Sequence, residues 1–340
     1  MTTVSSHWGN AITMDSFVAT SDSFRRVLDQ VNRLARSGTA PILLEGESGT
    51  GKTLLARYLH EVSPRSTRPF HAVVLSTLDD SLASSDLFGH VAGAFTDARR
   101  SRTGHFVASE GSTLLLDEIG KSSRPLQGKL LHAIEYNEVT PVGSDTPVHV
   151  DVRIVAATNV PLDVLVDRGE FLPDLAARFG YFRIIVPALR ERKADIPELV
   201  EQCVARHAPQ FGYASAPVVT TDLASILTLA QWPTNLRGLD SAIQYLLANA
   251  NGALQLTPDH CVGSLEHIVQ GLHSHSAQSV EETAELVAEL GSISAAAKAM
   301  GVPRSTVQRR LKKTDQTVVD QLIQGRYKLS EAKVEPLGSM

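Results

Sequence analysis

Residues 46–53 have the composition of a phosphate-binding loop. They read GESGTGKT and directly follow the apolar run 41–44. The glycines allow the backbone to wrap around a phosphate, so that loop N–H groups and the N-terminus of the following helix point at negative charge. Lys52 is expected to reach the β- and γ-phosphates, and Thr53 is expected to hold Mg²⁺. The segment therefore predicts ATP and Mg²⁺ as cofactors, with a nucleotide-binding set of Gly46, Glu47, Ser48, Gly49, Thr50, Gly51, Lys52, Thr53 and Leu54.

An acidic segment further along the chain is expected to complete this site. Residues 113–118 read TLLLDE, an apolar run that ends in two carboxylates. Asp117 would share Mg²⁺ with Thr53, and Glu118 would polarise the water that attacks the γ-phosphate. Asn159, which follows another apolar run, is placed to sense the γ-phosphate or to orient that water. Taken alone, the Asp-Glu pair is equally a capped helix start, and the upstream phosphate-binding loop is what favours catalysis.

Short apolar segments alternate with helical patterns from residue 16 to about residue 187. The strand-like segments are 41–44, 72–75, 113–116, 152–157 and 182–186, and the helical ones include 23–36, 52–62 and 125–135. Each strand-like segment is rich in Val, Ile and Leu on both faces, which is typical of a buried parallel strand. The alternation predicts an α/β fold with a parallel central sheet. From 188 to 262 the strands are expected to stop, and helices at 191–207, 221–231 and 236–250 predict a small helical subdomain.

Composition limits the classes of function that the chain can have. Its 340 residues carry a net charge of −5 and are 43% apolar, so any nucleic-acid binding must come from a local basic patch. Cys203 and Cys261 have neither a disulfide-framework spacing nor a zinc spacing. No targeting signal or membrane span is recognised, which predicts a cytoplasmic protein. Residues 1–15 are expected to be a tail, 263–280 a linker and 315–340 a second tail.

Residues 281–314 are expected to form an all-α helix-turn-helix domain. Helical stretches at 281–290, 294–300 and 304–313 place Gly301 in the turn between the last two helices. Residues 291–314 contain six basic residues and no acidic one, which favours DNA binding; a solvated basic helix is the alternative. The side chains expected to meet the bases of double-stranded DNA are Arg304, Ser305, Thr306 and Gln308, and those expected to meet phosphates are Arg309, Arg310, Lys312 and Lys313.

Several blocks of the sequence, taken in order, resemble one known family. The blocks are GESGTGKT at 46–53, DLFGHVAGAFTDA at 86–98, GSTLLLDEIG at 111–120, DVRIVAATN at 151–159, LRERKADIP at 189–197 and WPTNLRGL at 232–239. In them the chain resembles the AAA+ activators of RNA polymerase carrying sigma-54, also called bacterial enhancer-binding proteins. The resemblance covers residues 16–313, and its last part is similar to the Fis-like helix-turn-helix of that family. It implies an AAA+ core with a helical lid, in an activator that hydrolyses ATP to remodel sigma-54 RNA polymerase.

The resemblance also implies roles for single residues. Asn159 matches sensor I, and Arg237 matches the sensor II arginine that touches the nucleotide. Arg178 matches the arginine finger presented to a neighbouring subunit, which implies a ring, in this family usually a hexamer; a surface ion pair is the alternative. The residues that resemble the loop with which relatives press on sigma-54 are Gly93, Ala94, Phe95 and Thr96, and an ordinary packed loop is the alternative.

Three positions depart from the pattern of that family. Asp97 stands where the family has a glycine in the sigma-54 loop, and Val74 stands where relatives carry an asparagine that restrains the catalytic glutamate. Leu172 stands where relatives often have a second intersubunit arginine. The departures leave open a different function, that of a DNA-binding regulator or repressor that has lost sigma-54 remodelling. A helicase loader with the same core is a third candidate, which the loop at 93–98 disfavours.

Control of the protein is expected to act in trans, because no receiver or ligand-sensing domain precedes Ser16 in the sequence. The expected means of control are an inhibitory protein, a co-assembling paralogue or the expression level. The ring would accordingly be homo-oligomeric or shared with that paralogue.

Overall fold

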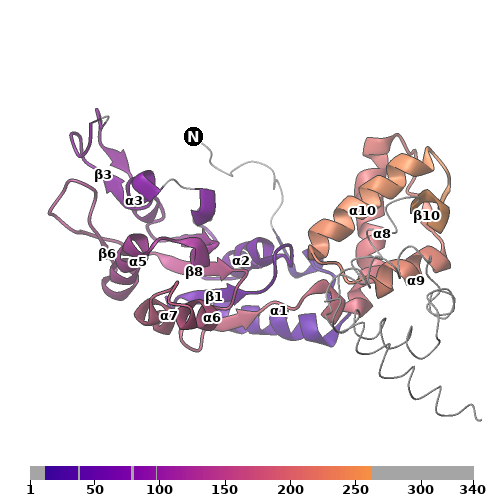
Figure 1. Ribbon diagram of the computed structural model, residues 1–340, viewed down its shortest axis with the longest axis horizontal. Helices are drawn as coiled ribbons and strands as arrows, with labels where there is room; N and C mark the ends of the chain where they lie inside the picture. Colours follow the sequence, from indigo (N-terminus) through magenta and orange to yellow (C-terminus); the bar gives the residue numbers. More distant parts are fainter. Residues whose placement is uncertain (1–11, 37–38, 78–79, 97, 262–340) are drawn as a thin grey trace, which may run out of the picture. The chain divides into compact units, whose positions relative to one another are not determined.

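Five short parallel strands form a central sheet. The computed structural model describes residues 12–36, 39–77, 80–96 and 98–261. Asp97, the segments expected at 263–280, 281–314 and 315–340, and every expected DNA contact lie outside these ranges. The strand order is β2 (His71–Val74), β5 (Thr113–Asp117), β8 (Arg153–Thr158), β1 (Ile42–Glu45) and β9 (Arg183–Ile185), with all neighbours parallel (Figure 1). The parallel-sheet prediction is confirmed, and every strand lies within one residue of its expected bounds.

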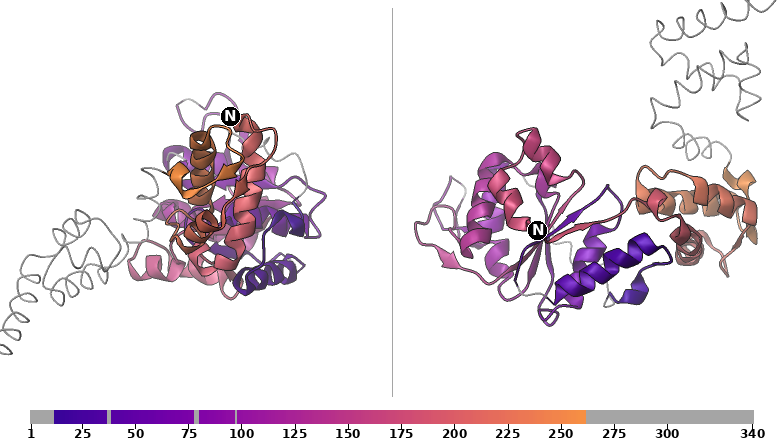
Figure 2. Two further views of the ribbon diagram at one scale, coloured as in Figure 1. Left: turned by 90° about the vertical axis from the view of Figure 1, so that its right-hand side faces the viewer. Right: turned by 90° about the horizontal axis from the view of Figure 1, so that it is seen from below.

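Helices cover both faces of this sheet (Figure 2). Successive residues of a strand point to opposite faces, and in β1 Leu43 joins one buried cluster while Leu44 joins the other. The helices on the Leu44 face are α1 (Asp22–Ala35) and α2 (Lys52–Glu61). Those on the Leu43 face are α3 (Asp80–Phe88), α4 (His105–Ala108), α5 (Arg124–Tyr136), α6 (Leu162–Asp167) and α7 (Pro173–Phe179). The helices expected at 23–36, 52–62 and 125–135 are thereby confirmed.

The folded region was expected to start at residue 16, but packed structure begins a few residues earlier. Ile12 is buried in the cluster of α1 and α2, and the short turn η1 (Met14–Ser16) follows it. At the other end of α1, the fully buried Arg153 donates hydrogen bonds to Ala35 O at 2.6 Å and to Leu34 O at 2.5 Å. A helix leaves carbonyls unpaired at its C-terminus, and a cation is favourable there. Arg153 therefore fixes α1 to the sheet.

Two antiparallel ribbons carry loops that lie side by side. One ribbon is β3 (Gly89–His90) with β4 (Arg102–Thr103), and the other is β6 (Glu138–Val139) with β7 (Val148–His149) (Figure 1). Val91 N donates to Val142 O at 3.1 Å, and Val142 N donates to Gly89 O at 2.9 Å. The loop between β3 and β4, which contains residues 93–96, is therefore supported at its base by the second loop.

The described residues from 188 onward form a subdomain that is mainly helical, as expected. Its helices are α8 (Ile196–His207), α9 (Thr221–Leu229) and α10 (Asn235–Ala250). The expectation that strands stop here is wrong, because β10 (Val218–Val219) and β11 (Gln255–Leu256) pair in parallel. The helix expected at 191–207 begins only at Ile196, since Arg192 has a non-helical backbone and its buried guanidinium pairs with Asp195 at 2.6 Å.

Short 3₁₀ turns complete the architecture. They are η2 (Leu75–Thr77), η3 (Ile119–Lys121), η4 (Leu189–Glu191), η5 (Lys193–Asp195), η6 (Ala208–Phe211) and η7 (Pro258–Cys261). Within the described ranges, none of the helices has the length and apolar character needed to cross a bilayer.

Candidate active site

The residues predicted to bind phosphate form the loop between β1 and α2. Gly49 and Gly51 have φ angles of 80° and 99°, which glycine adopts without steric cost. Gly51 caps α2, so the unpaired N–H groups of the first helical turn face the loop. Lys52 Nζ donates to Gly46 O at 2.6 Å and to Glu47 O at 2.9 Å. Burial lowers the pKa of Lys52.

A cavity of about 260 Å³ lies at the edge where the carboxyl ends of β1, β5 and β8 meet. Open parallel sheets bind ligands at this edge. Its walls come from the phosphate-binding loop, the ends of β5 and β8, and the first turn of α10. The lining residues are Ser48, Gly49, Gly51, Lys52, Thr53, Asp117, Glu118, Asn159, Leu236 and Arg237. All of them except Leu236 belong to the set expected from the sequence, so the structure brings these distant residues together.

Thr53 and Asp117 fit the expected Mg²⁺ ligands. Thr53 Oγ1 donates to Asp117 Oδ2 at 2.9 Å, so the two oxygens lie at one point of the cavity. Mg²⁺ at phosphate sites takes one or two protein oxygens and completes its shell with phosphate and water. Among the described residues, no group of three or more His, Cys, Asp and Glu is arranged to hold a metal by itself. The donor set therefore suits an ion that shares its ligands with a phosphate.

Glu118 is held by two groups to which sequence reasoning did not point. It follows β5 with a left-handed φ of 58°, and its Oε2 accepts a hydrogen bond from Lys121 Nζ at 2.9 Å. Two hydrogen bonds lower the pKa of Glu118. The one from Ser76 has the larger effect, and the one from Lys121 has the next largest. Val74 pairs with Asp117 in the sheet register, but its side chain has no hydrogen-bonding group. Ser76, two residues further along the chain, carries the hydroxyl that lowers the pKa of Glu118.

The helical subdomain contacts the phosphate-binding loop directly. Arg237 Nη1 donates to Ser48 Oγ at 3.2 Å, and Leu236 N donates to Gly49 O at 3.0 Å. Arg237 therefore lies beside the loop, where an arginine that touches the nucleotide was expected.

Four members of the expected nucleotide-binding set do not line the cavity. Gly46 contributes a carbonyl to Lys52, and a Cβ on Gly46 would lie 2.6 Å from a backbone oxygen. The carboxylate of Glu47 turns to the helical subdomain. Thr50 Oγ1 donates to Glu47 O at 2.9 Å, and Leu54 packs half-buried against the cluster of α1 and α2. These residues shape the loop.

The expected arginine finger does not line the cavity of its own chain. Arg178 lies in the last turn of α7, and its Nη2 pairs with Glu135 Oε1 on α5 at 2.6 Å. Both side chains of this ion pair are partly exposed. Leu172 precedes α7 and packs half-buried against the core, so it offers no second charge at this surface.

The segment 93–96 lies in the loop between β3 and β4. Phe95 is 38% exposed, and its ring meets His90 edge-on with centroids 5.0 Å apart. His90 is itself fixed by Ser85 Oγ at 2.7 Å and by the carbonyl of Arg100 at 2.9 Å. The exposed residues of the segment are Gly93, Phe95 and Thr96, and Ala94 is half-buried. The loop therefore presents an apolar ring at the surface.

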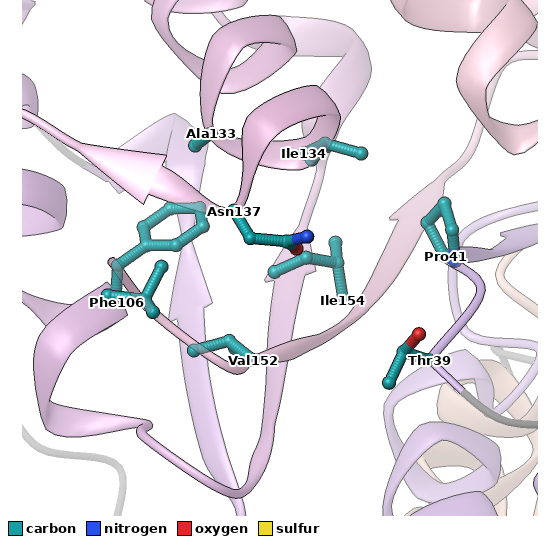
Figure 3. A pocket seen from close by; sticks show the side chains of 9 residues that line it. Thr39, Pro41, Phe106, Ala133, Ile134, Asn137, Val152 and Ile154 are labelled. Atoms are coloured by element: carbon teal, nitrogen blue, oxygen red, sulfur yellow. The ribbon is translucent and has the colours of Figure 1, made fainter. Parts of the chain in front are cut away.

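A second and much smaller cavity lies at the amino end of β8. Its volume is about 20 Å³, which is room for about one water molecule. Figure 3 shows the side chain of Asn137 reaching toward Ile154 among apolar neighbours that include Phe106 and Val152. A nucleotide does not fit this volume, so the cavity at the phosphate-binding loop is the candidate active site.

Sequence reasoning missed Ser76 and Lys121, which interact with Glu118, and Arg190 and Asn235, which donate hydrogen bonds to Glu47. Arg190 and Asn235 lie inside the blocks LRERKADIP and WPTNLRGL, which marked their segments but not their partners. Ser76 follows β2, and its nearness to Glu118 depends on the register between β2 and β5.

The chain matches two protein families along most of its described length. The family described as Sigma-54 interaction domain matches residues 17–185, and the family described as AAA+ ATPase lid domain matches residues 190–286. The matched segments include the cavity at the phosphate-binding loop.

Regulatory proteins of bacteria are similar to this chain in sequence. It is 43% identical over 228 residues to a Nif-specific regulatory protein of Azotobacter vinelandii, an alignment that covers 67% of this chain and 43% of that protein. It is 40% identical over 238 residues to the transcriptional regulatory protein GlrR of Escherichia coli (strain K12), covering 69% and 52%. The chain therefore spans about half the length of these relatives.

A solved structure shares the fold. NtrX from Brucella abortus in complex with ADP is similar with a TM-score of 0.66 and 28% identity, over 87% of this chain and 68% of that one. The architecture is thus an α/β AAA+ P-loop fold with a parallel central sheet and a helical lid.

Proposed function

The chain belongs to the family of sigma-54-dependent transcriptional regulators, and from that membership we propose that it is an activator that hydrolyses ATP to remodel sigma-54 RNA polymerase. In this proposal it binds upstream DNA, assembles into a ring and opens promoters. ATP and Mg²⁺ are its cofactors.

The observation that carries the proposal is the composition of one cavity. It joins a phosphate-binding loop that ends in Lys52, an oxygen pair made by Thr53 and Asp117, and the carboxylate of Glu118. Phosphoryl transfer depends almost entirely on positioning and on charge stabilisation, and these groups supply both. The ADP complex of NtrX, which has a similar fold, supports the same class of ligand.

Each group in the cavity has a distinct role in this reaction. Lys52 would exchange its two carbonyl partners for the β- and γ-phosphates. Thr53 and Asp117 would hold Mg²⁺, which when bound neutralises charge on the phosphate oxygens. Glu118 would polarise the attacking water, Asn159 would sense the γ-phosphate or orient that water, and Arg237 would touch the nucleotide.

Other surfaces would connect hydrolysis to transcription. Arg178 lies outside its own cavity and would complete that of a neighbouring subunit, which supports a ring such as a hexamer. Residues 93–96 would press on sigma-54, and the exposed ring of Phe95 supports that contact. Residues 281–314 would bind DNA through the basic segment 291–314.

Formation of open complexes tests the proposal. The full-length chain is mixed with sigma-54 RNA polymerase, promoter DNA and ATP, and promoter melting and ATP turnover are both measured. Wild type is expected to hydrolyse ATP and to open the promoter, whereas Thr96→Ala is expected to hydrolyse ATP without opening it. Wild type that turns over ATP and leaves the promoter closed would refute the activator function.

That refuting outcome would favour the second candidate, a DNA-binding AAA+ regulator or repressor without remodelling activity. Its support is Leu172, which packs against the core where a second intersubunit arginine was expected. With fewer charges at the subunit interface, ATP hydrolysis at one site would be coupled less strongly to movement of the neighbouring subunit.

A further inference from the structure

Glu47 is an acidic residue inside a loop that binds negative charge. A carboxylate that faced the phosphates would repel them, since like charges in a shared site disfavour each other. In the structure this side chain turns away from the cavity to Arg190, whose Nη1 donates to Oε2 at 2.8 Å and whose Nη2 donates to Oε1 at 2.5 Å. A two-point contact between guanidinium and carboxylate fixes orientation as well as distance. The side chain of Glu47 therefore belongs to the boundary with the lid.

Asn235 extends this contact into the interior. It is fully buried and has a φ of 53°, a left-handed conformation that asparagine tolerates. Its Nδ2 donates to Glu47 Oε2 at 3.2 Å and to Ser48 O at 2.9 Å, and its Oδ1 accepts from Leu189 N at 2.7 Å. If these partners separated, buried polar groups would be left unpaired, at substantial free-energy cost. One side chain thus ties two loop residues to the start of the lid.

The backbone of Glu47 faces the other way, into the phosphate-binding loop. Its carbonyl accepts hydrogen bonds from Lys52 Nζ and from Thr50 Oγ1, both at 2.9 Å. Lys52 is the group expected to bind phosphate. Ligand binding would therefore remove one hydrogen-bond donor from the carbonyl of Glu47, the residue whose side chain contacts the lid. The fit between loop and lid is close, because a Cβ on Gly49 would lie 2.2 Å from Thr234 O. A change in the loop therefore has a direct path to the lid.

We propose that Glu47, Arg190 and Asn235 form a clasp that couples phosphate binding in the loop to the orientation of the lid, and hence of Arg237. The clasp rests on the proposed ATPase function and makes Glu47 a positioning residue, not a nucleotide ligand. An isolated, partly exposed ion pair would contribute little. The buried amide of Asn235 is what joins this pair to the loop.

Full-length Glu47→Gln and Arg190→Gln proteins test the clasp. Hydrogen exchange in the first turn of α10 is measured with and without a nonhydrolysable ATP analogue, together with analogue affinity and steady-state hydrolysis. The analogue is expected to slow exchange about fivefold in wild type and less than about twofold in either variant. Both variants should bind the analogue within about threefold of wild type, while kcat falls about tenfold and KM changes less than about threefold.

Arg183→Gln is the matched control. Arg183 makes the same two-point contact with Asp163, at 2.6 and 3.0 Å, outside the phosphate-binding loop. This variant should keep the wild-type response to the analogue, and the double variant of Glu47 and Arg190 should be no worse than either single one.

Two outcomes separate the clasp from the function on which it rests. Nucleotide-dependent protection that survives in both single variants, or a rise in KM without a fall in kcat, would overturn the clasp and leave the ATPase intact. Wild type that binds no analogue would overturn both proposals.

Discussion

Replacement of Ser76 by alanine is expected to raise kcat for ATP hydrolysis about fivefold. The carboxylate of Glu118 accepts hydrogen bonds from Ser76 and Lys121. In the proposed reaction, the water that Glu118 would polarise competes with both groups for the same oxygens. Loss of the hydroxyl frees one acceptor position, and Val74, the neighbour of Asp117 in the sheet, cannot occupy it.

The magnitude follows from the exposure of Glu118. A hydrogen bond to a charged group contributes roughly 1.5–3 kcal/mol where it is buried. The side chain of Glu118 is 32% exposed, and solvent screening reduces this contribution to about 1 kcal/mol. A change of about 1 kcal/mol in the barrier corresponds to about fivefold in rate.

Steady-state hydrolysis by the full-length chain measures the effect. Ser76→Thr keeps the hydroxyl and should behave as wild type. Thr77→Val is the matched control, because the Thr77 hydroxyl donates to Val74 O at 2.8 Å in the same turn. The pair Val74→Asn with Ser76→Ala should return kcat to the wild-type value, since an amide then stands beside Asp117. A Ser76→Ala protein whose kcat is unchanged or reduced would show that Ser76 does not restrain Glu118.

Three further changes test other parts of the structure. Gly49→Ala should weaken binding of an ATP analogue by about tenfold or more in calorimetry, because its Cβ would meet Thr234 O and its φ of 80° disfavours alanine. Gly128→Ala is the control, since a Cβ there has open space, and it should bind the analogue normally. Equal affinities of the two variants would contradict the packing argument. Arg178→Ala should lower kcat of the assembled protein about a hundredfold or more with unchanged analogue affinity, and a normal kcat would exclude it as the finger. Burial lowers the pKa of His60, so the unfolded chain binds more protons, and the free energy of unfolding should fall as pH drops through about 6.5. Urea denaturation at two pH values measures this pH dependence, which should be weaker in His60→Gln. An unchanged pH dependence would contradict the assignment to His60.

The central sheet was predictable because its strands are buried on both faces. Such strands are continuous runs of Val, Ile and Leu, and each of the five lies within one residue of its expected bounds. The strands β10 and β11 were missed because each has only two residues, and Val218 is mostly exposed. The late start of α8 depends on the buried pair of Arg192 and Asp195, which is anchored to a distant segment by hydrogen bonds to Val18 O and from Ser21. These tertiary contacts override a helical pattern.

The convergence of the candidate site residues was predictable for a topological reason. Parallel strands deliver their carboxyl ends to one edge, so the residues that follow β1, β5 and β8 must converge there. Ser76, Arg190 and Asn235 were not predictable in the same way, because their partners are fixed by strand register and by lid packing. Those contacts link segments up to 188 residues apart in the chain, and no local pattern encodes them.

The charged groups of the candidate site differ in how easily they can change partners. Arg178 with Glu135, and Glu118 with Lys121, are partly exposed ion pairs, which contribute about 0–1 kcal/mol each and yield readily to a competing partner. Lys52 is buried, and the two carbonyls to which it donates would each lose a hydrogen bond when it turned to phosphate. Glu47 O would keep its hydrogen bond from Thr50 Oγ1, but phosphate brings acceptors and not donors, so the carbonyl of Gly46 would be satisfied only by a rearrangement of the loop. The carbonyl of Gly46 belongs to the peptide that joins Gly46 to Glu47, so the rearrangement would occur beside the residue whose side chain contacts Arg190 and Asn235. This peptide is where nucleotide occupancy would be converted into lid movement.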